Sequence, residues 1–355
     1  MSESTRSGKT ASPLWQLTVS SFKEFYREPI AIFWVYGFPL ILCFILGLAF
    51  RNKPVEKIPI VVVQTDGPAV DALVSKLKSD PRLKIDVMSD SEARNEFRTA
   101  KASLVVTPTP NSPGYSYLFE PNRPESVLAK AAVDVALLRQ QNPNMAVPKE
   151  ETLTEPGGRY IDFLIPGLMG ANLMGGGLWG VGFGIVDKRV KKLLKRLLAT
   201  PMLKSDFIKS LVISRIYFTA LQMAAFLLFA YLGYGIVVRG NYLALVIIML
   251  LGTVCFSGFG LLVASRANKL ESAQGLMNLV MLPSYLFSGV FFSSANFPDW
   301  SQPIISALPL TALNDGLRAV INDGAGLTGI VYPSIVMIGW SVVCYTIGGK
   351  LFRWL

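Results

Sequence analysis

The stretch IAIFWVYGFPLILCFILGLAF, residues 30–50, decides the fold class, because none of its 21 residues is charged. As an α-helix it rises about 1.5 Å per residue, enough to cross the roughly 30 Å hydrocarbon core of a bilayer. Five further apolar stretches follow: Ile161–Val186, Leu211–Val238, Tyr242–Ala264, Ala273–Phe292 and Ile330–Gly349. The sequence therefore predicts an α-helical membrane protein with six transmembrane helices.

Residues 51–159, between the first two stretches, are polar enough to form a separate water-soluble domain. Hydrophobic periodicity alternates between the two secondary-structure types along this insertion. The predicted strands are Ile58–Val63, Leu83–Met88, Ala102–Thr107 and Tyr115–Phe119, and the predicted helices are Ala69–Lys78, Ser91–Thr99 and Glu125–Gln141. This order predicts an inserted α/β domain with a mixed sheet. It has no glycine-rich phosphate loop, which favours binding or structural work over catalysis.

The basic residues predict the orientation, because Lys and Arg in short loops are retained in the cytoplasm. They concentrate before the first span and after the second, at Arg6, Lys9, Lys23, Arg27, Lys188, Arg189, Lys191, Lys192, Lys195, Arg196 and Lys204. The short loops at the other face hold only Arg239 and Arg318. We expect both termini in the cytoplasm and the inserted domain outside.

Charge and composition exclude several kinds of function. The net charge is +10, yet residues 51–158 hold 14 basic and 14 acidic side chains, so the excess lies at the inner membrane surface. That distribution argues for membrane lipids, and against nucleic acid, as partners. The chain has no His, and its three Cys lie within predicted spans. We expect no catalytic residues, no metal site and no disulfide framework.

Two polar segments flank the predicted spans. Residues 1–29 are predicted to form a cytoplasmic tail and an interfacial helix with an aromatic face. Residues 186–198 have apolar residues on one helical face and basic residues on the other, which predicts one basic amphipathic helix. Its role is open: a contact with anionic lipid, a docking surface for a cytoplasmic protein, or both. Residues 293–323 are half apolar, which predicts a broken or re-entrant segment at the outer mouth.

Small and polar residues within the spans give weaker predictions. Gly176, Gly180 and Gly184 lie four residues apart, a spacing that favours close helix packing, between protomers or within one chain. Asp162 and Arg318 lie near the outer ends of the membrane region, so we expect almost no charge deep inside it. This favours an amphipathic or lipid-like cargo over an ion. The candidate pathway residues are Asn172, Met174, Asn278, Met281 and Phe287.

No complete phosphate-binding loop accompanies these spans. Residues 7–10, SGKT, resemble the end of one, but the glycine expected five residues before Gly8 is replaced by Glu3. If transport uses ATP, another chain hydrolyses it. The alternative is a membrane receptor or scaffold whose outer domain senses a ligand.

Several short motifs then occur in a recognisable order. They are FKEFYREP at 22–29, Pro39, YIDFLIPGL at 160–168, LLATPM at 197–202, FPDW at 297–300, LPLT at 308–311 and Leu317-Arg318. On this topology the chain resembles the membrane subunits of ABC exporters of the ABC-2 type, in the subgroup with a large extracytoplasmic domain between spans one and two. The resemblance covers nearly the whole chain.

The resemblance implies a permease of the bacterial cytoplasmic (inner) membrane, dimeric with itself or with a related permease. It implies export of a drug, antibiotic or lipid, driven by ABC ATPase subunits that bind ATP and Mg²⁺. It also implies a coupling helix at 187–201 that docks on the ATPase, with Arg189, Lys192, Lys195, Arg196, Thr200 and Pro201 as candidate contacts. Many relatives carry a Glu-Arg-Glu-x-Gly-Thr pattern here, whereas this chain has Val190, Lys192 and Leu193 at the second acidic, Gly and Thr positions.

Overall fold

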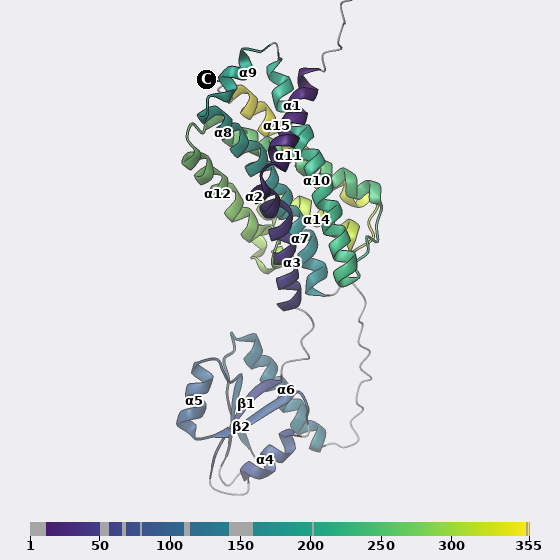
Figure 1. The fold of residues 1–355 in the computed structure, drawn as a ribbon. Helices are drawn as coiled ribbons and strands as arrows, with labels where there is room; N and C mark the ends of the chain where they lie inside the picture. The colour runs from purple at the N-terminus through teal and green to yellow at the C-terminus, as the bar shows by residue number, and fades with distance from the viewer. Residues whose placement is uncertain are drawn as a thin grey trace, which may run out of the picture. The chain divides into compact units, whose positions relative to one another are not determined.

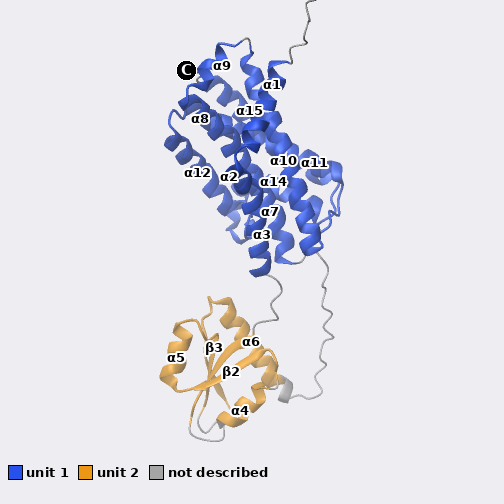
Figure 2. Cartoon of the chain, viewed as in Figure 1, with its two compact units in different colours: residues 1–51, 154–355 blue, residues 52–153 orange. Residues whose placement is uncertain are grey.

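The computed structural model describes residues 12–49, 57–65, 69–78, 80–109, 114–141, 159–200, 202–352 and 354. The chain divides into two compact units, which are coloured separately in Figure 2. Unit 1 combines residues 1–51 with 154–355, and unit 2 is residues 52–153. Unit 2 is thus inserted after the first membrane helix. The residues of the SGKT segment lie outside the described residues, as does Pro201.

Unit 2 is built on one four-stranded mixed sheet. Its strands are β1 (Ile58–Val63), β2 (Leu83–Met88), β3 (Leu104–Pro108) and β4 (Tyr115–Leu118). The order is β2-β1-β3-β4, in which β1 pairs parallel with β2 and β3, and β4 is antiparallel to β3. The predicted mixed sheet is confirmed, and every predicted strand coincides with an observed one to within two residues.

Helices cover both faces of this sheet, which explains the continuous apolar run of β1. They are α4 (Ala69–Lys78), α5 (Asp90–Arg98) and α6 (Pro124–Gln141). Ile60 and Val62 pack in one cluster with residues of α4 and α6. Val61 and Val63 point to the opposite face and pack with residues of α5. The period of two along a strand therefore gives β1 two buried faces.

Unit 1 consists of helices. In its first part they are α1 (Pro13–Tyr26), α2 (Pro29–Ile32), the π-helix η1 (Phe33–Gly37), α3 (Phe38–Ala49), α7 (Tyr160–Gly175), the π-helix η2 (Gly176–Phe183), α8 (Gly184–Val190) and α9 (Leu193–Leu198). The second part contains α10 (Lys204–Tyr234), α11 (Tyr242–Arg266), α12 (Leu270–Phe287), η3 (Ser294–Asn296), η4 (Asp299–Ser301), α13 (Gln302–Ser306), α14 (Pro309–Ile321), η5 (Leu327–Ile330) and α15 (Val331–Leu351).

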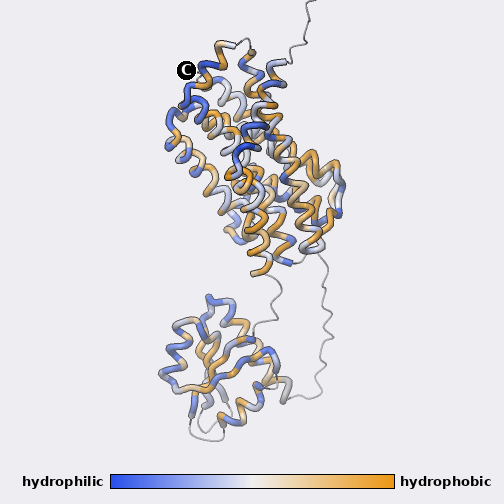
Figure 3. Tube along the Cα trace, viewed as in Figure 1, coloured by the Kyte–Doolittle hydropathy of each residue, from blue (hydrophilic) through white to orange (hydrophobic). Residues whose placement is uncertain are grey.

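Among the described residues, five helices are long and apolar enough to cross a membrane. They are Pro29–Ala49, Tyr160–Val190, Lys204–Tyr234, Tyr242–Arg266 and Leu327–Leu351. These correspond to five of the six predicted spans, and Figure 3 shows the hydrophobic residues that run along them. The predicted span Ala273–Phe292 corresponds to α12, which does not meet the same criterion because polar residues such as Gln274 and Asn278 dilute its apolar content.

A bent helix pair is the sixth candidate crossing. Asp299–Ser306 and Pro309–Ile321 meet at 86° across a short break. Pro309 at the first position of α14 has no N–H to donate, and the preceding Leu308 is held in an extended conformation. The bend falls within residues 293–323, for which the sequence predicts a broken or re-entrant segment.

Several segments meet at one end of unit 1. Figure 1 shows α1, α9 and the C-terminus there, while α3 ends and α7 begins at the opposite end. Ring contacts fix the C-terminus, since Trp354 lies 5.9 Å from Phe207 of α10 and 4.8 Å from Phe352 between ring centroids.

Candidate functional site

A cavity of about 830 Å³ lies among the membrane helices of unit 1. Five parts of the chain line it: α1, the continuous helix α2–η1–α3, the continuous helix α7–η2–α8, α10 and α12. Its walls are mainly apolar and aromatic, with Phe25, Trp34, Phe38, Leu42, Trp179, Phe183, Phe218, Met281 and Tyr285 among the lining residues. A volume of this size accommodates an amphipathic molecule of drug or lipid dimensions.

Polar side chains enter this cavity from α10 and α7. Gln222 of α10 donates from Nε2 to the carbonyl oxygen of Val35 at 2.7 Å, and its Nε2 lies 3.4 Å from Oδ1 of Asn172. Tyr36 donates to the carbonyl oxygen of Phe218 at 3.2 Å. Val35 and Tyr36 lie in the π-helix η1, a helix type that is often found at functional sites. These hydrogen bonds therefore connect the first span to the middle part of α10.

Arg215 of α10 also lines the cavity and is 5% exposed. Its Nε and Nη2 atoms are buried with no hydrogen-bond partner among the described residues. Arg215 lies one turn inside the apolar stretch that begins at Leu211. The expectation of almost no intramembrane charge is therefore wrong. The signal was present in the sequence, as a lone Arg within the predicted span Leu211–Val238.

The glycine prediction is corrected in its location. A Cβ on Gly176 would overlap the Arg215 guanidinium, and one on Gly180 would lie 3.3 Å from Nη1 of that residue. Gly184 has no atom within 4 Å of such a Cβ. Gly176 and Gly180 thus make room for the arginine side chain of α10, and no described residue of the chain packs on Gly184.

The close helix contact is made by other glycines. A Cβ on Gly177 would overlap the Phe256 backbone of α11, and one on Gly182 would lie 2.8 Å from the carbonyl oxygen of Gly260. Gly177 and Gly182 are five residues apart in the π-helix η2, where hydrogen bonds run from i to i+5. A face predicted with α-helical spacing therefore falls on the wrong residues.

The structure separates the five predicted pathway residues. Asn172 and Met281 line the cavity. Met174 is fully buried in the helix core, and Asn278 is exposed on α12. Phe287 packs on Phe297 with ring centroids 5.1 Å apart. Asn172 and Met281 are thus the two predicted pathway residues that lie at this cavity.

The predicted single basic helix over 186–198 is two helices. Lys192 has φ 58°, a left-handed conformation that separates α8 from α9. Lys192, Lys195, Arg196 and Thr200 are all exposed, and the Thr200 hydroxyl donates to the carbonyl oxygen of Leu197 at 2.6 Å. Lys191 is also exposed, and its hydrogen bond to Asp187 raises the pKa of its ammonium group. The exposed basic surface thus belongs to α9 and its flanks.

Arg189 takes a different position from these residues. Its Nη1 donates hydrogen bonds of 2.6 Å to the carbonyl oxygens of both Ala264 and Ala267, at the end of α11. Its guanidinium carbon lies 5.2 Å from the ring centroid of Phe352. Nearby, Lys188 forms a 2.8 Å ion pair with Glu24 of α1. Arg189 thus ties α8 to α11 and the C-terminus, and it does not present its guanidinium as part of the exposed surface.

The charges near the other end of unit 1 have partners within the chain. Asp162 accepts from Nη2 of Arg159 at 2.8 Å and from the backbone N–H of Arg159 at 3.1 Å, at the start of α7. Arg318 donates to the carbonyl oxygens of Phe163 and Gly289 and stacks 3.7 Å from the Phe163 ring centroid. These contacts hold α7 against α14 and the turn after α12.

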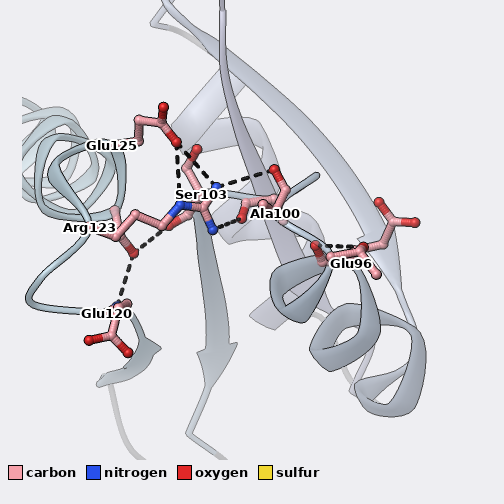
Figure 4. Close-up of polar contacts among 9 residues, drawn as sticks. Glu96, Ala100, Ser103, Glu120, Arg123 and Glu125 are labelled. Atoms are coloured by element: carbon pink, nitrogen blue, oxygen red, sulfur yellow. Dashed lines mark hydrogen bonds and ion pairs between the residues drawn. The ribbon is translucent and has the colours of Figure 1, made fainter. Parts of the chain in front are cut away.

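Unit 2 has a polar cluster that is internally satisfied. Figure 4 shows Arg123 reaching the carbonyl oxygen of Ala100, at 3.2 Å, and the carboxylate of Glu125. Arg123 also donates to the carbonyl oxygen of Ala102 at 3.3 Å. Ser126 donates to the carbonyl oxygen of Ser103 at 2.6 Å. This cluster fixes the start of α6 to the loop before β3. Among the residues that the structure describes, no group of His, Cys, Asp and Glu has the arrangement of a metal site.

Membrane helices around an amphipathic cavity define a multi-pass α-helical membrane protein of the permease class. Comparison with known proteins gives the family: the model for ABC-2 family transporter proteins matches residues 29–350. The chain belongs to this family. Membrane subunits of the family pair with an ABC ATPase that hydrolyses ATP.

Two curated proteins are similar to the chain. ABC transporter G family member 20 of Dictyostelium discoideum is 24% identical over 220 residues, covering 59% of this chain and 30% of that protein. The linearmycin resistance permease protein LnrN of Bacillus subtilis (strain 168) is 23% identical over 233 residues, covering 64% of this chain and 58% of that protein. The matched part of the chain spans less than two thirds of the length of either relative.

Proposed function

We propose that this chain is the membrane-spanning permease subunit of an ATP-driven ABC-2 exporter that moves an amphipathic or lipid-like substrate, such as a drug, antibiotic or lipid, outward. The observation that carries the proposal is the cavity, whose aromatic walls and few buried polar groups suit a substrate with one apolar and one polar part. The similarity to a linearmycin resistance permease supports efflux of such a molecule.

In this proposal the ATPase is a separate subunit, which binds the ATP and Mg²⁺. Its motion reaches the permease through the segment 187–201, of which α9 is the exposed part. Lys195 and Arg196 of α9 are exposed, with Lys192 before them and Thr200 after them. Pro201 belongs to the same proposed contact. Arg189 serves as the internal anchor that passes the motion to α11.

The orientation follows from the distribution of basic residues. Both termini, α1 and α9 face the cytoplasm, and unit 2 lies outside the bacterial cytoplasmic membrane. The exposed apolar faces of the spans, for example Leu228 and Leu232 of α10, contact membrane lipids. The active form is a dimer with itself or with a related permease, and nucleic acid is not a partner.

Transport by the reconstituted complex tests this function. The permease is co-expressed with an ABC ATPase that co-purifies with it, and inside-out vesicles are supplied with a fluorescent alkyl amphipath. The proposal predicts uptake that needs ATP and that stops when the ATPase carries a substitution abolishing hydrolysis. A chain that co-purifies with no ATPase and moves no amphipath would instead fit a receptor or scaffold.

A further inference from the structure

The side chain of Arg215 is a buried cation for which the described part of the chain supplies no anion. It is 5% exposed, and its Nε and Nη2 are buried without hydrogen-bond partners among the described residues. The adjacent Ser214 donates its hydroxyl to the carbonyl oxygen of Ser210 at 2.8 Å. An unpaired charge within a membrane bundle is strongly unfavourable, so such a residue marks a place where a partner binds.

The acidic residues that line the same cavity do not pair with it. Glu24 forms its ion pair with Lys188 at 2.8 Å, and it is half exposed. Glu28 is exposed and immediately precedes Pro29 at the start of the first span. No ion pair to Arg215 occurs within the described ranges. The anion that suits this guanidinium therefore comes from outside the described part of the chain.

The surrounding backbone makes room for the guanidinium itself. Gly176 and Gly180 lie beside the guanidinium, where any side chain on Gly176 would overlap it. The planar guanidinium presents several N–H donors in a fixed fork, which matches the paired oxygens of a carboxylate or a phosphate. The cavity wall therefore carries a guanidinium that is seated against Gly176 and Gly180 and that retains donors without a partner among the described residues.

Gln222 extends the polar surface away from Arg215. It lies seven residues further along α10, about 10 Å at 1.5 Å per residue. Its Oε1 is buried without a partner among the described residues, while its Nε2 is held by Val35. Beyond this level the lining is apolar, with Phe38 and Leu42 of α3. A ligand would therefore meet Arg215 with its anionic group, Gln222 with a polar middle part and the apolar lining with its tail, in that order from the end of unit 1 at which α1 lies.

We infer that Arg215 binds the anionic group of the cargo, a carboxylate or phosphate carried on a single apolar tail. This rests on the proposed function and narrows its substrate to anionic amphipaths. The same chemistry occurs in anionic membrane lipids and in amphipaths from the cytoplasm. The two sources are separated by comparing nanodiscs of phosphatidylcholine alone with nanodiscs that also contain phosphatidylglycerol.

Binding of two matched probes tests the inference on the purified full-length permease in phosphatidylcholine nanodiscs. The probes are dansylaminoundecanoic acid and its neutral carboxamide, followed by dansyl fluorescence. We expect the acid to bind about 10- to 100-fold more tightly, the range for hydrogen bonds to charged groups. Weaker binding of the acid when phosphatidylglycerol is present would identify the lipid as a competing occupant.

Two substitutions of Arg215 test whether this side chain causes the binding preference for the acid. Arg215→Gln should lower the affinity for the acid to that for the amide and leave the amide unchanged, and Arg215→Lys should keep part of the preference. If Arg215→Gln does not fold, Gly176→Ala should also remove the preference by displacing the guanidinium. Lys209→Gln, an exposed position on α10, is the control and should change neither affinity. Equal binding of the two probes by the unsubstituted chain, or a preference kept in Arg215→Gln, would overturn the inference.

ATP-driven uptake into inside-out vesicles is read separately. Uptake of the amide as fast as the acid, without a binding preference, would leave the exporter function standing and remove the anion site. A strong preference for the acid without ATP-dependent uptake of either probe would keep the site and remove the exporter function.

Discussion

Nη1 of Arg189 donates a 2.6 Å hydrogen bond to the carbonyl oxygen of Ala264, in the last turn of α11. The last carbonyls of a helix have no partner within it, and the helix dipole favours a cation there. The same nitrogen also reaches Ala267 at 2.6 Å. The C-terminal end of α8, directly before α9, is therefore bound to α11. In the proposed exporter, we expect movement of α9 to reach that helix through this contact.

Replacing Arg189 by Gln should destabilise unit 1, because two carbonyls lose a charged donor. A loss of about 2 kcal/mol is expected from hydrogen bonds to a charged group. Thermal unfolding of the purified permease, followed by tryptophan fluorescence, measures the change. Arg196→Gln, at an exposed position in α9, should change the transition little. Equal stability of the two variants would show that the Arg189 contact is energetically unimportant.

Reversing the charge of α9 should weaken the ATPase complex. In Lys195→Glu with Arg196→Glu, like charges would face each other if the docking surface of the ATPase is acidic, and such a contact can cost several kcal/mol. The measurement is recovery of the ATPase with a tagged permease at equal expression. Lys209→Glu with Lys269→Glu is the matched control, with the same charge change at exposed positions outside α9. Undiminished recovery would leave α9 as a lipid-surface helix.

A glycine of η2 and one of α8 should differ sharply in their tolerance of substitution. Gly177→Ala places a methyl group against the Phe256 backbone, which cannot move aside without separating η2 from α11. We expect a loss of about 1–3 kcal/mol in stability. Gly184→Ala, where nothing lies within 4 Å, should be neutral or stabilising by up to about 1 kcal/mol. Thermal unfolding compares the two variants, and a destabilised Gly184→Ala with an unaffected Gly177→Ala would contradict the assignment of the packing face.

Cysteine labelling should establish the orientation. In a variant with Cys43, Cys255 and Cys344 changed to Ala, single cysteines replace Ser91 of α5 and Ser205 of α10, both exposed. An impermeant thiol reagent added to intact spheroplasts should label the cysteine at position 91 only. Labelling at 205 alone would mean that unit 2 faces the cytoplasm.

The sequence predicted those parts of the fold in which local pattern and final environment agree. The run Ile58–Val63 is β-branched and becomes the central strand β1, since both of its faces are buried. The charge-free first span is likewise a single membrane-length helix from Pro29 to Ala49. In each case the local residue pattern is enough to indicate the observed element.

The predictions that failed depended on backbone geometry or on partners distant in sequence. The left-handed Lys192 interrupts a helix whose apolar spacing suggested continuity. The π-helix η2 moves the close contact from Gly176 to Gly177, because the spacing of one face changes with the turn. Arg189 looked like one of several surface cations, and only the fold brings it to Ala264, 75 residues away. Arg215 was visible in the sequence, but its lack of a partner was not.

The claim that the cavity is the transport route is tested most directly by filling it. Asn172→Trp introduces a large side chain at a half-buried lining position, and Leu228→Trp adds the same side chain on the exposed side of α10. ATP-dependent uptake of dansylaminoundecanoic acid is measured in inside-out vesicles with equal amounts of the permease–ATPase complex. We predict that Asn172→Trp lowers uptake to the level without ATP while the ATPase remains bound, and that Leu228→Trp transports normally. Undiminished uptake by Asn172→Trp would contradict the account.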